Sequence, residues 1–329
     1  MGGSWSGKTA SKGQLAPVQP VAAEPTKASP EEPAGAETAD GRDALRTALL
    51  ELERGDTTHI MLSSLTIEDA GVRSICKSLA AKPAGLETLN LGINRLTNDS
   101  CTALAGVLPS TALKSLTLER CGLTSAGIVA LAGALPASLE TLMIGRNEVG
   151  VDGAKALAQS KNQLHTLGVG FASLLTEGMK ALVPALARLR VVDLAGNHIG
   201  GPGGVFVAQA LPGSSLETLK LESNGVADEG ARAFGEALAA AKKLKRLELR
   251  RNSVTDDGVK QLLVGLRRNS SLTFLDLFDN SITDAGARAL LEVVQGRRSA
   301  GEPVLKADLN DNHVAGPLMS DLREGGRAA

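Results

Sequence analysis

The chain has 329 residues, which is long for one ordinary domain but suits a repeat array that grows along one axis. Its formal net charge of -1 excludes a global electrostatic attraction to nucleic acid, so no nucleic-acid partner is expected. The three cysteines are an odd number without metal-ligand spacing, and we interpret them as free thiols in a reducing compartment.

Residues 1–39 differ in composition from the rest of the chain. Ala, Pro, Glu, Thr and Ser dominate, and such a segment cannot bury enough apolar surface to offset the entropy of ordering. We therefore expect a disordered N-terminal arm. No apolar run resembles a signal peptide or a membrane span, which favours a cytoplasmic protein.

The first residues match two short motifs. Met1 and Gly2 with Ser6 fit the pattern for N-myristoylation of Gly2, and one acyl chain would give a weak, reversible membrane contact. The alternative is an unmodified, flexible terminus. Gly2 to Thr9 also matches the phosphate-loop pattern, but that loop binds phosphate only between a buried strand and a helix. Neither is expected here, so no cofactor is predicted.

Residues 40–56 predict a capping helix. Leu45, Leu49 and Leu52 share one helical face, and Asp40 can cap its start. An open repeat array exposes its terminal core, which this helix is expected to cover. A helix lying on a membrane surface is the alternative, and its mixed charge disfavours it.

A unit built on Leu-x-x-Leu-x-Leu recurs over residues 57–318 in steps of about 25 to 29 residues. Alternation places its leucines on one side of a short strand. A helix signal such as Thr255-Asp256-Asp257-Gly258 follows, in which we assign the aspartates to the helix start. The ninth position is usually asparagine: Leu65, Asn94, Cys121, Asn147, Ala172, Asn197, Asn224, Asn252, Asn280 and Asn312.

These units resemble the leucine-rich repeats of the ribonuclease-inhibitor type. The resemblance implies an α/β leucine-rich repeat solenoid of about ten repeats, shaped like a horseshoe. A parallel sheet would line its concave side and helices its convex side. It does not identify a function, because fold and site are separable. Residues 319–329 are expected to form a flexible C-terminal tail.

Template positions three, five, seven and eight are expected to point into the concave side. These positions are mostly small in the first repeats and charged from the sixth onward. Exposed aromatic rings beside arginines are the composition of an interface hot spot, so a protein-binding surface is predicted there. Its candidate residues are Phe171, Arg246, Glu248, Arg250, Arg251, Phe274, Asp276, Phe278 and Asp279. The alternative is that neighbouring side chains cover the rings, with Arg250 stacking on Phe278 inside the molecule.

No catalytic, cofactor or metal residue is predicted. The four histidines lie in different repeats without metal-ligand spacing, and the Ser, His and Asp residues are too scattered to indicate a triad. The favoured function is a monomeric, non-enzymatic scaffold or adaptor that binds another protein on its concave face.

Two alternatives stay open. The repeats are similar to those of GTPase-activating proteins for Ran, although that group carries a strongly acidic tail and this chain does not. A nuclease inhibitor is the other alternative, although those relatives are rich in cysteine and tryptophan.

Overall fold

The structure is a computed structural model that describes residues 39–82 and 85–326. The predicted N-terminal arm, apart from its last residue, and Gly2 lie outside the described residues. The strands are β1 His59–Met61, β2 Thr88–Asn90, β3 Ser115–Thr117, β4 Thr141–Met143, β5 Thr166–Gly168, β6 Val191–Asp193, β7 Thr218–Lys220, β8 Arg246–Glu248, β9 Phe274–Asp276 and β10 Lys306–Asp308.

The helices alternate with these strands along the chain. They are α1 Ala39–Arg54, α2 Asp69–Ala81, α3 Asn98–Ala105, the 3-10 helix η1 Leu108–Ser110, α4 Ser125–Ala132, α5 Gly150–Gln159, α6 Leu175–Leu186, α7 Gly200–Ala210, α8 Ala227–Leu238, α9 Asp256–Leu266, α10 Asp284–Ser299 and α11 Gly316–Arg323. No helix among the described residues is both long and apolar enough to cross a membrane.

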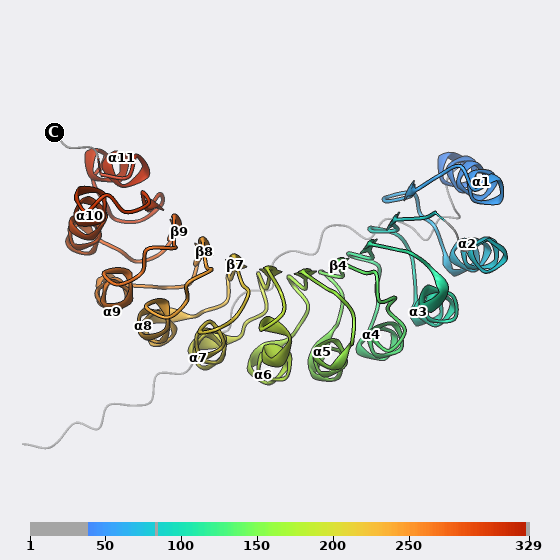
Figure 1. Cartoon of the computed structure of the whole chain (residues 1–329), viewed down its shortest axis with the longest axis horizontal. Helices are drawn as coiled ribbons and strands as arrows, with labels where there is room; N and C mark the ends of the chain where they lie inside the picture. The colour runs from blue at the N-terminus through green and yellow to red at the C-terminus, as the bar shows by residue number, and fades with distance from the viewer. Residues whose placement is uncertain (1–38, 83–84, 327–329) are drawn as a thin grey trace, which may run out of the picture. The chain divides into compact units, whose positions relative to one another are not determined.

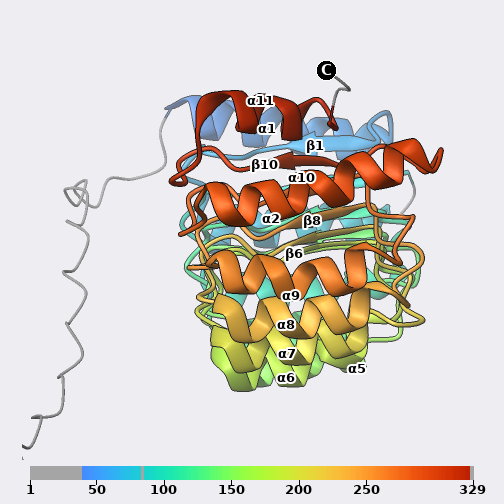
Figure 2. The same cartoon turned by 90° about the vertical axis from the view of Figure 1, so that its left-hand side faces the viewer.

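The ten strands form one sheet in chain order, and each neighbouring pair is parallel. Figure 1 shows the strands on the inner side of the arc formed by the repeats and the helices on its outer side. Figure 2 shows successive helices stacked in order along the array. The predicted α/β leucine-rich repeat solenoid, with its concave parallel sheet, is confirmed.

The core lies between the sheet and the helices and runs from repeat to repeat. Template positions one, four and six are Leu272, Leu275 and Leu277 in the repeat of β9, and all three side chains are fully buried. Each buried leucine contributes about 1.5–3 kcal/mol of burial free energy. Because each repeat packs mainly on its neighbours, stability accumulates along the array.

The ninth-position asparagines hold adjacent repeats together. Asn280 Oδ1 accepts hydrogen bonds from the backbone N–H groups of Asn252 (3.0 Å) and Val254 (2.9 Å). Its Nδ2 donates to the carbonyls of Leu249 and Leu277, both at 2.9 Å. A buried polar backbone group without such a partner would be destabilising.

Three repeats lack this asparagine and have Leu65, Cys121 or Ala172 in its place. The Cys121 thiol donates to the carbonyl of Leu91 at 3.2 Å. At Ala172, the backbone carbonyl accepts from the N–H groups of Val149 (3.1 Å) and Gly150 (3.3 Å). Backbone rearrangement therefore replaces the missing acceptor at Ala172.

The aspartates assigned to helix starts also bridge successive repeats. Asp256 accepts hydrogen bonds from the N–H (2.8 Å) and hydroxyl (2.6 Å) of Thr283 and from the N–H of Gly286 (3.1 Å). Burial raises the pKa of Asp256, but these hydrogen bonds outweigh it and hold the pKa below its ordinary value. A Cβ at Gly286 would lie under 3.0 Å from Asp256 Oδ1, so glycine leaves room for this carboxylate.

Helices close both ends of the described array. Helix α1 packs against α2 and buries Ala48 and Leu52, while Lys82 Nζ donates to the α1 carbonyls of Glu53 (2.9 Å) and Arg54 (3.1 Å). Its span, Ala39–Arg54, lies close to the expected 40–56.

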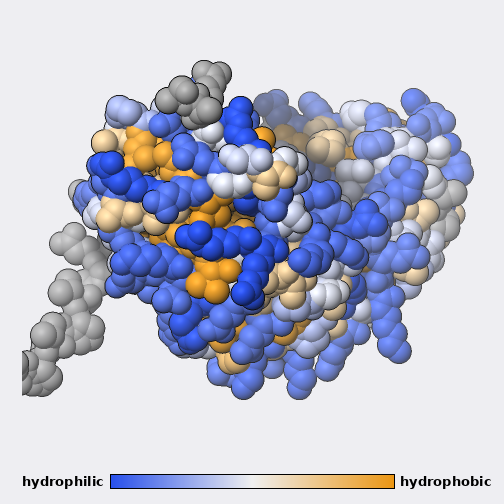
Figure 3. Space-filling model, turned by 60° about the vertical axis from the view of Figure 1, so that its left-hand side comes forward, coloured by the Kyte–Doolittle hydropathy of each residue, from blue (hydrophilic) through white to orange (hydrophobic). Residues whose placement is uncertain are grey.

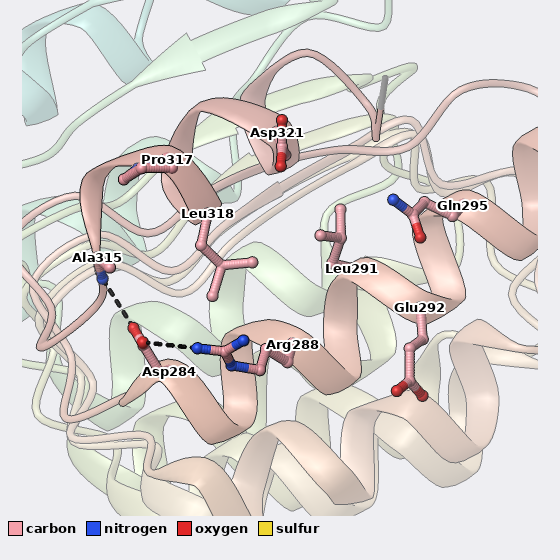
Figure 4. A pocket seen from close by; sticks show the side chains of 9 residues that line it. All are labelled: Asp284, Arg288, Leu291, Glu292, Gln295, Ala315, Pro317, Leu318 and Asp321. Carbon is pink, nitrogen blue, oxygen red and sulfur yellow. Dashed lines mark hydrogen bonds and ion pairs between the residues drawn. The ribbon is translucent and has the colours of Figure 1, made fainter. Parts of the chain in front are cut away.

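The flexible tail expected at 319–329 is wrong for its first part, because residues 319–323 belong to α11. The reason is apolar spacing: Leu322 is fully buried, and Leu318, four residues earlier, packs on the core. Leu318 and Leu291 of α10 point into a hollow of about 570 Å³ (Figure 4). Figure 3 shows hydrophobic side chains reaching the surface between hydrophilic ones over these C-terminal helices.

Candidate protein-binding surface

All the candidate protein-binding residues except Phe171 lie together on β8, β9 and the turns that follow them. Parallel pairing sets Arg246 opposite Phe274 and Glu248 opposite Asp276. The remaining members follow at positions seven and eight of the same two repeats. We call this set the C-terminal cluster: Arg246, Glu248, Arg250, Arg251, Phe274, Asp276, Phe278 and Asp279. Phe171 follows β5, several repeats away, and is not part of it.

Arginines cover both phenylalanines of the C-terminal cluster. The guanidinium carbon of Arg246 lies 3.9 Å from the ring centroid of Phe274, and that of Arg250 lies 4.4 Å from the centroid of Phe278. Both rings are half-buried, so the expectation of exposed rings at these positions is wrong. The strand register brings each arginine over a ring, and a weakly hydrated planar guanidinium favours that stacking. A partner would therefore meet guanidinium faces here.

The charges of the C-terminal cluster are paired within the molecule. Arg251 contacts Asp279 at 2.9 Å and Glu222 at 3.4 Å, and Arg246 pairs with Glu248. The hydrogen bond from Arg251 to Asp279 raises the pKa of the arginine. Exposed pairs such as these contribute little to stability, but they fix where the charges stand. Glu222 was predicted to lie in the charged concave row but not to be a protein-binding residue, because only the folded register shows its proximity to Arg251.

Asp276 has a structural role that its sequence position did not reveal. Its side chain is 5% exposed, and Oδ1 accepts a hydrogen bond from the Phe278 N–H at 3.0 Å. Burial raises its pKa, the carboxylates of Asp308 and Glu248 add to that rise, and Arg250 at 3.8 Å opposes it. Asp193 and Asp308 accept the same bond from the residue two positions on, each at 3.0 Å. Aspartate at position five therefore stabilises the turn after the strand.

Among the described residues, Phe171 is the exposed aromatic residue, and it lies in the N-terminal half of the array. Phe171 is 46% exposed, and the guanidinium carbon of Arg146 lies 4.5 Å from its ring centroid. The ring lies over Gly196, where a Cβ would come within 3.0 Å of it. Ile93, which was not predicted as a site residue, is 49% exposed at the same template position. The repeat pattern places position eight on the concave side, so that pattern could have identified Ile93.

Among residues 39–82 and 85–326, no group of three or more His, Cys, Asp or Glu residues is placed to hold a metal ion. Burial raises the pKa of Cys76 to about 11 and of Cys101 to about 12, and all three cysteines are unpaired and buried. These thiols are therefore protonated and poorly nucleophilic at neutral pH.

Five segments of the chain match the family described as Leucine Rich repeat: residues 136–158, 188–208, 214–235, 240–263 and 268–291. The ribonuclease inhibitor of Sus scrofa is 32% identical over 194 residues, covering 56% of this chain and 37% of the relative. That of Mus musculus is 29% identical over 201 residues, covering 56% and 44%.

Human NACHT, LRR and PYD domains-containing protein 13 is 30% identical over 176 residues, covering 52% of this chain and 14% of the relative. The chain thus spans less than half the length of these relatives. A solved TLR13–ssRNA13 complex aligns over 70% of this chain and 33% of that chain with a TM-score of 0.41 and 22% identity. The repeated unit, the parallel ten-stranded sheet and the matches to the repeat family and to the ribonuclease inhibitors identify the chain as a leucine-rich repeat protein of the ribonuclease-inhibitor-like type.

Proposed function

We propose that this protein is a non-enzymatic scaffold or adaptor that binds another protein on its concave face through the C-terminal cluster. The observation that carries the proposal is the pair of register-locked stacks, Arg246 on Phe274 and Arg250 on Phe278. Arginine and aromatic residues dominate interface hot spots. Because the sheet holds both stacks in place before binding, little conformational entropy is lost when a partner docks.

The paired charges define what such a partner presents. Arg251 and Asp279 form an exposed pair at the edge of the cluster, and Arg250 lies at its centre beside the buried Asp276. A partner must place carboxylates or carbonyls near the guanidinium groups and a cationic group near Asp279. Such complementarity favours specificity and fast association over raw affinity.

Charge reversal at the centre tests this proposal. Arg250→Glu removes one stack and places a second carboxylate beside Asp276, so loss of the principal partner is expected in quantitative affinity capture from cytosol. The matched control is Arg232→Glu on α8, where an exposed arginine pairs with Glu236 at 2.7 Å. Circular dichroism checks that both variants fold. Equal capture by Arg250→Glu and Arg232→Glu would place the interface elsewhere.

Ribonuclease inhibition is a second candidate, favoured by the identity to the Sus scrofa and Mus musculus proteins of that name. Titrating the purified chain into a pancreatic-type ribonuclease assay tests it. Tight, stoichiometric loss of ribonuclease activity would promote this function above the scaffold, and full activity at saturating protein would remove it. The Ran-type GTPase regulator gains no support from these relatives.

We also propose that the protein is tethered to a membrane, and this proposal depends on the N-terminal sequence motif alone. N-myristoylation of Gly2 would give a monomeric cytoplasmic protein a weak, reversible membrane contact. Co-expression with an N-myristoyltransferase followed by intact-mass measurement tests it. An unmodified mass would remove the anchor and leave the scaffold function unaffected.

A further inference from the structure

Four consecutive repeats place Ile93, Arg120, Arg146 and Phe171 at template position eight, and we call this row the N-terminal rim. The backbone N–H groups of Ile93, Arg120 and Arg146 each donate to the next repeat, at 2.7, 2.9 and 2.7 Å. The four residues are therefore neighbours along one edge of the concave face, and all are exposed.

The backbone of the rim is left-handed. The φ angles of Ile93, Arg120, Arg146 and Phe171 are 57°, 51°, 58° and 54°. For a β-branched or bulky side chain this conformation is unfavourable, whereas glycine and asparagine adopt it readily. The repeat imposes the conformation, but it does not impose isoleucine or phenylalanine. Neither exposed side chain offsets the strain by burial, which points to a role outside the folding of the repeat.

The arginines of the rim differ from those of the C-terminal cluster in having no carboxylate partner. Among the described residues, Arg120 and Arg146 form no ion pair, although Glu119 and Glu148 are close in sequence. The Arg146 guanidinium stacks on the ring of Phe171. A hollow of about 430 Å³ adjoins that stack, lined by Arg146, Phe171, Thr124 and Ser173 together with Glu148.

We propose that the N-terminal rim is a second interaction surface, which binds an acidic segment of a partner protein. Carboxylates of that segment pair with the guanidinium groups of Arg120 and Arg146, each of which can donate two parallel hydrogen bonds to one carboxylate. Apolar side chains of the same segment pack on Ile93 at one end of the row and on Phe171 at the other. This inference deepens the proposed scaffold function and rests on it, because it adds the chemistry of one partner segment.

The probe is a fluorescent peptide of alternating glutamate and leucine, measured by anisotropy against the full chain. The two comparison probes are the same peptide with lysine for glutamate and a single-stranded RNA oligonucleotide. We expect the acidic peptide to bind most tightly. Arg146→Glu should weaken it by about tenfold or more, as hot-spot residues do. Arg232→Glu on α8 is the matched control, since it reverses an exposed arginine outside both proposed surfaces, and it should leave binding unchanged.

Ile93→Asn separates binding from folding. Asparagine suits the left-handed backbone, so this variant should melt at the same or a higher temperature than the wild type while binding the acidic peptide more weakly. If Arg146→Glu, Ile93→Asn and the wild type bind the acidic peptide equally, the proposal that the N-terminal rim binds an acidic segment is wrong. Tighter binding of the RNA than of the acidic peptide would also contradict it. If a cellular partner is lost with Arg250→Glu but retained with Arg146→Glu, the proposed scaffold function is supported and the proposed binding at the N-terminal rim is refuted.

Discussion

Removal of one ladder asparagine is expected to lower the free energy of unfolding measurably. Asn280→Ala leaves the N–H groups of Asn252 and Val254 without their acceptor and the carbonyls of Leu249 and Leu277 without their donor. A buried unsatisfied group costs about 1–3 kcal/mol, and the two N–H groups are the more costly. Ala172 shows that a backbone carbonyl can take over part of this role. We therefore expect a loss of about 2–4 kcal/mol.

Urea unfolding followed by circular dichroism measures this loss. The control is Asn310→Ala, because Asn310 stands in the neighbouring repeat and its side chain forms no hydrogen bond with the described residues. Its unfolding free energy should stay within about 0.5 kcal/mol of the wild type. If Asn280→Ala is as stable as Asn310→Ala, the ladder does not hold the repeats together and the reasoning fails.

Three further predictions concern the helix starts and the thiols. Gly286→Ala should lower the free energy of unfolding by about 1–3 kcal/mol, because the added Cβ collides with Asp256. The control is Gly296→Ala in the same helix, where a Cβ meets nothing within 4 Å. In thermal melts this control should be as stable as the wild type or more stable. Folding lowers the pKa of Asp256, so the stability that its carboxylate contributes is present above its unfolded pKa and is lost as the pH falls through the folded pKa. The free energy of unfolding of Asp256→Asn should therefore depend less on pH than that of the wild type below about pH 5. Parallel curves for the two proteins would contradict this. Iodoacetamide at about pH 8 should leave Cys76 and Cys101 unmodified in the native protein and should label them in urea. Intact-mass measurement distinguishes the two results. Rapid labelling of the native protein would contradict the prediction, because it would show that the thiols are accessible.

The repeat pattern predicted the fold because each template position has one physical role. Leu272, Leu275 and Leu277 are buried as the strand period requires, and Asn280 bonds the backbone as its donor and acceptor groups allow. Helix α11 was missed because it lies beyond the last complete template. Its two anchoring leucines, Leu318 and Leu322, give too short a signal to separate a helix from a tail.

The candidate surface was predicted in its residues but not in their exposure. Position in the template set Phe274 and Phe278 on the concave face, yet only the register shows that Arg246 and Arg250 cover them. Ile93 stands at position eight, which the template places on the concave side, but it was not predicted as a site residue because only aromatic and charged side chains were taken as candidates. Pair distances and backbone angles across repeats, which sequence spacing does not encode, decide these features.

The central claim is that the concave C-terminal cluster binds a protein, and the dissociation constant of the captured partner tests it most directly. Isothermal titration of the purified partner should give an affinity for Arg250→Glu that is weaker than wild type by about tenfold or more, equivalent to about 1.4 kcal/mol. The Arg232→Glu control should match the wild type. An unchanged dissociation constant for Arg250→Glu would contradict the account.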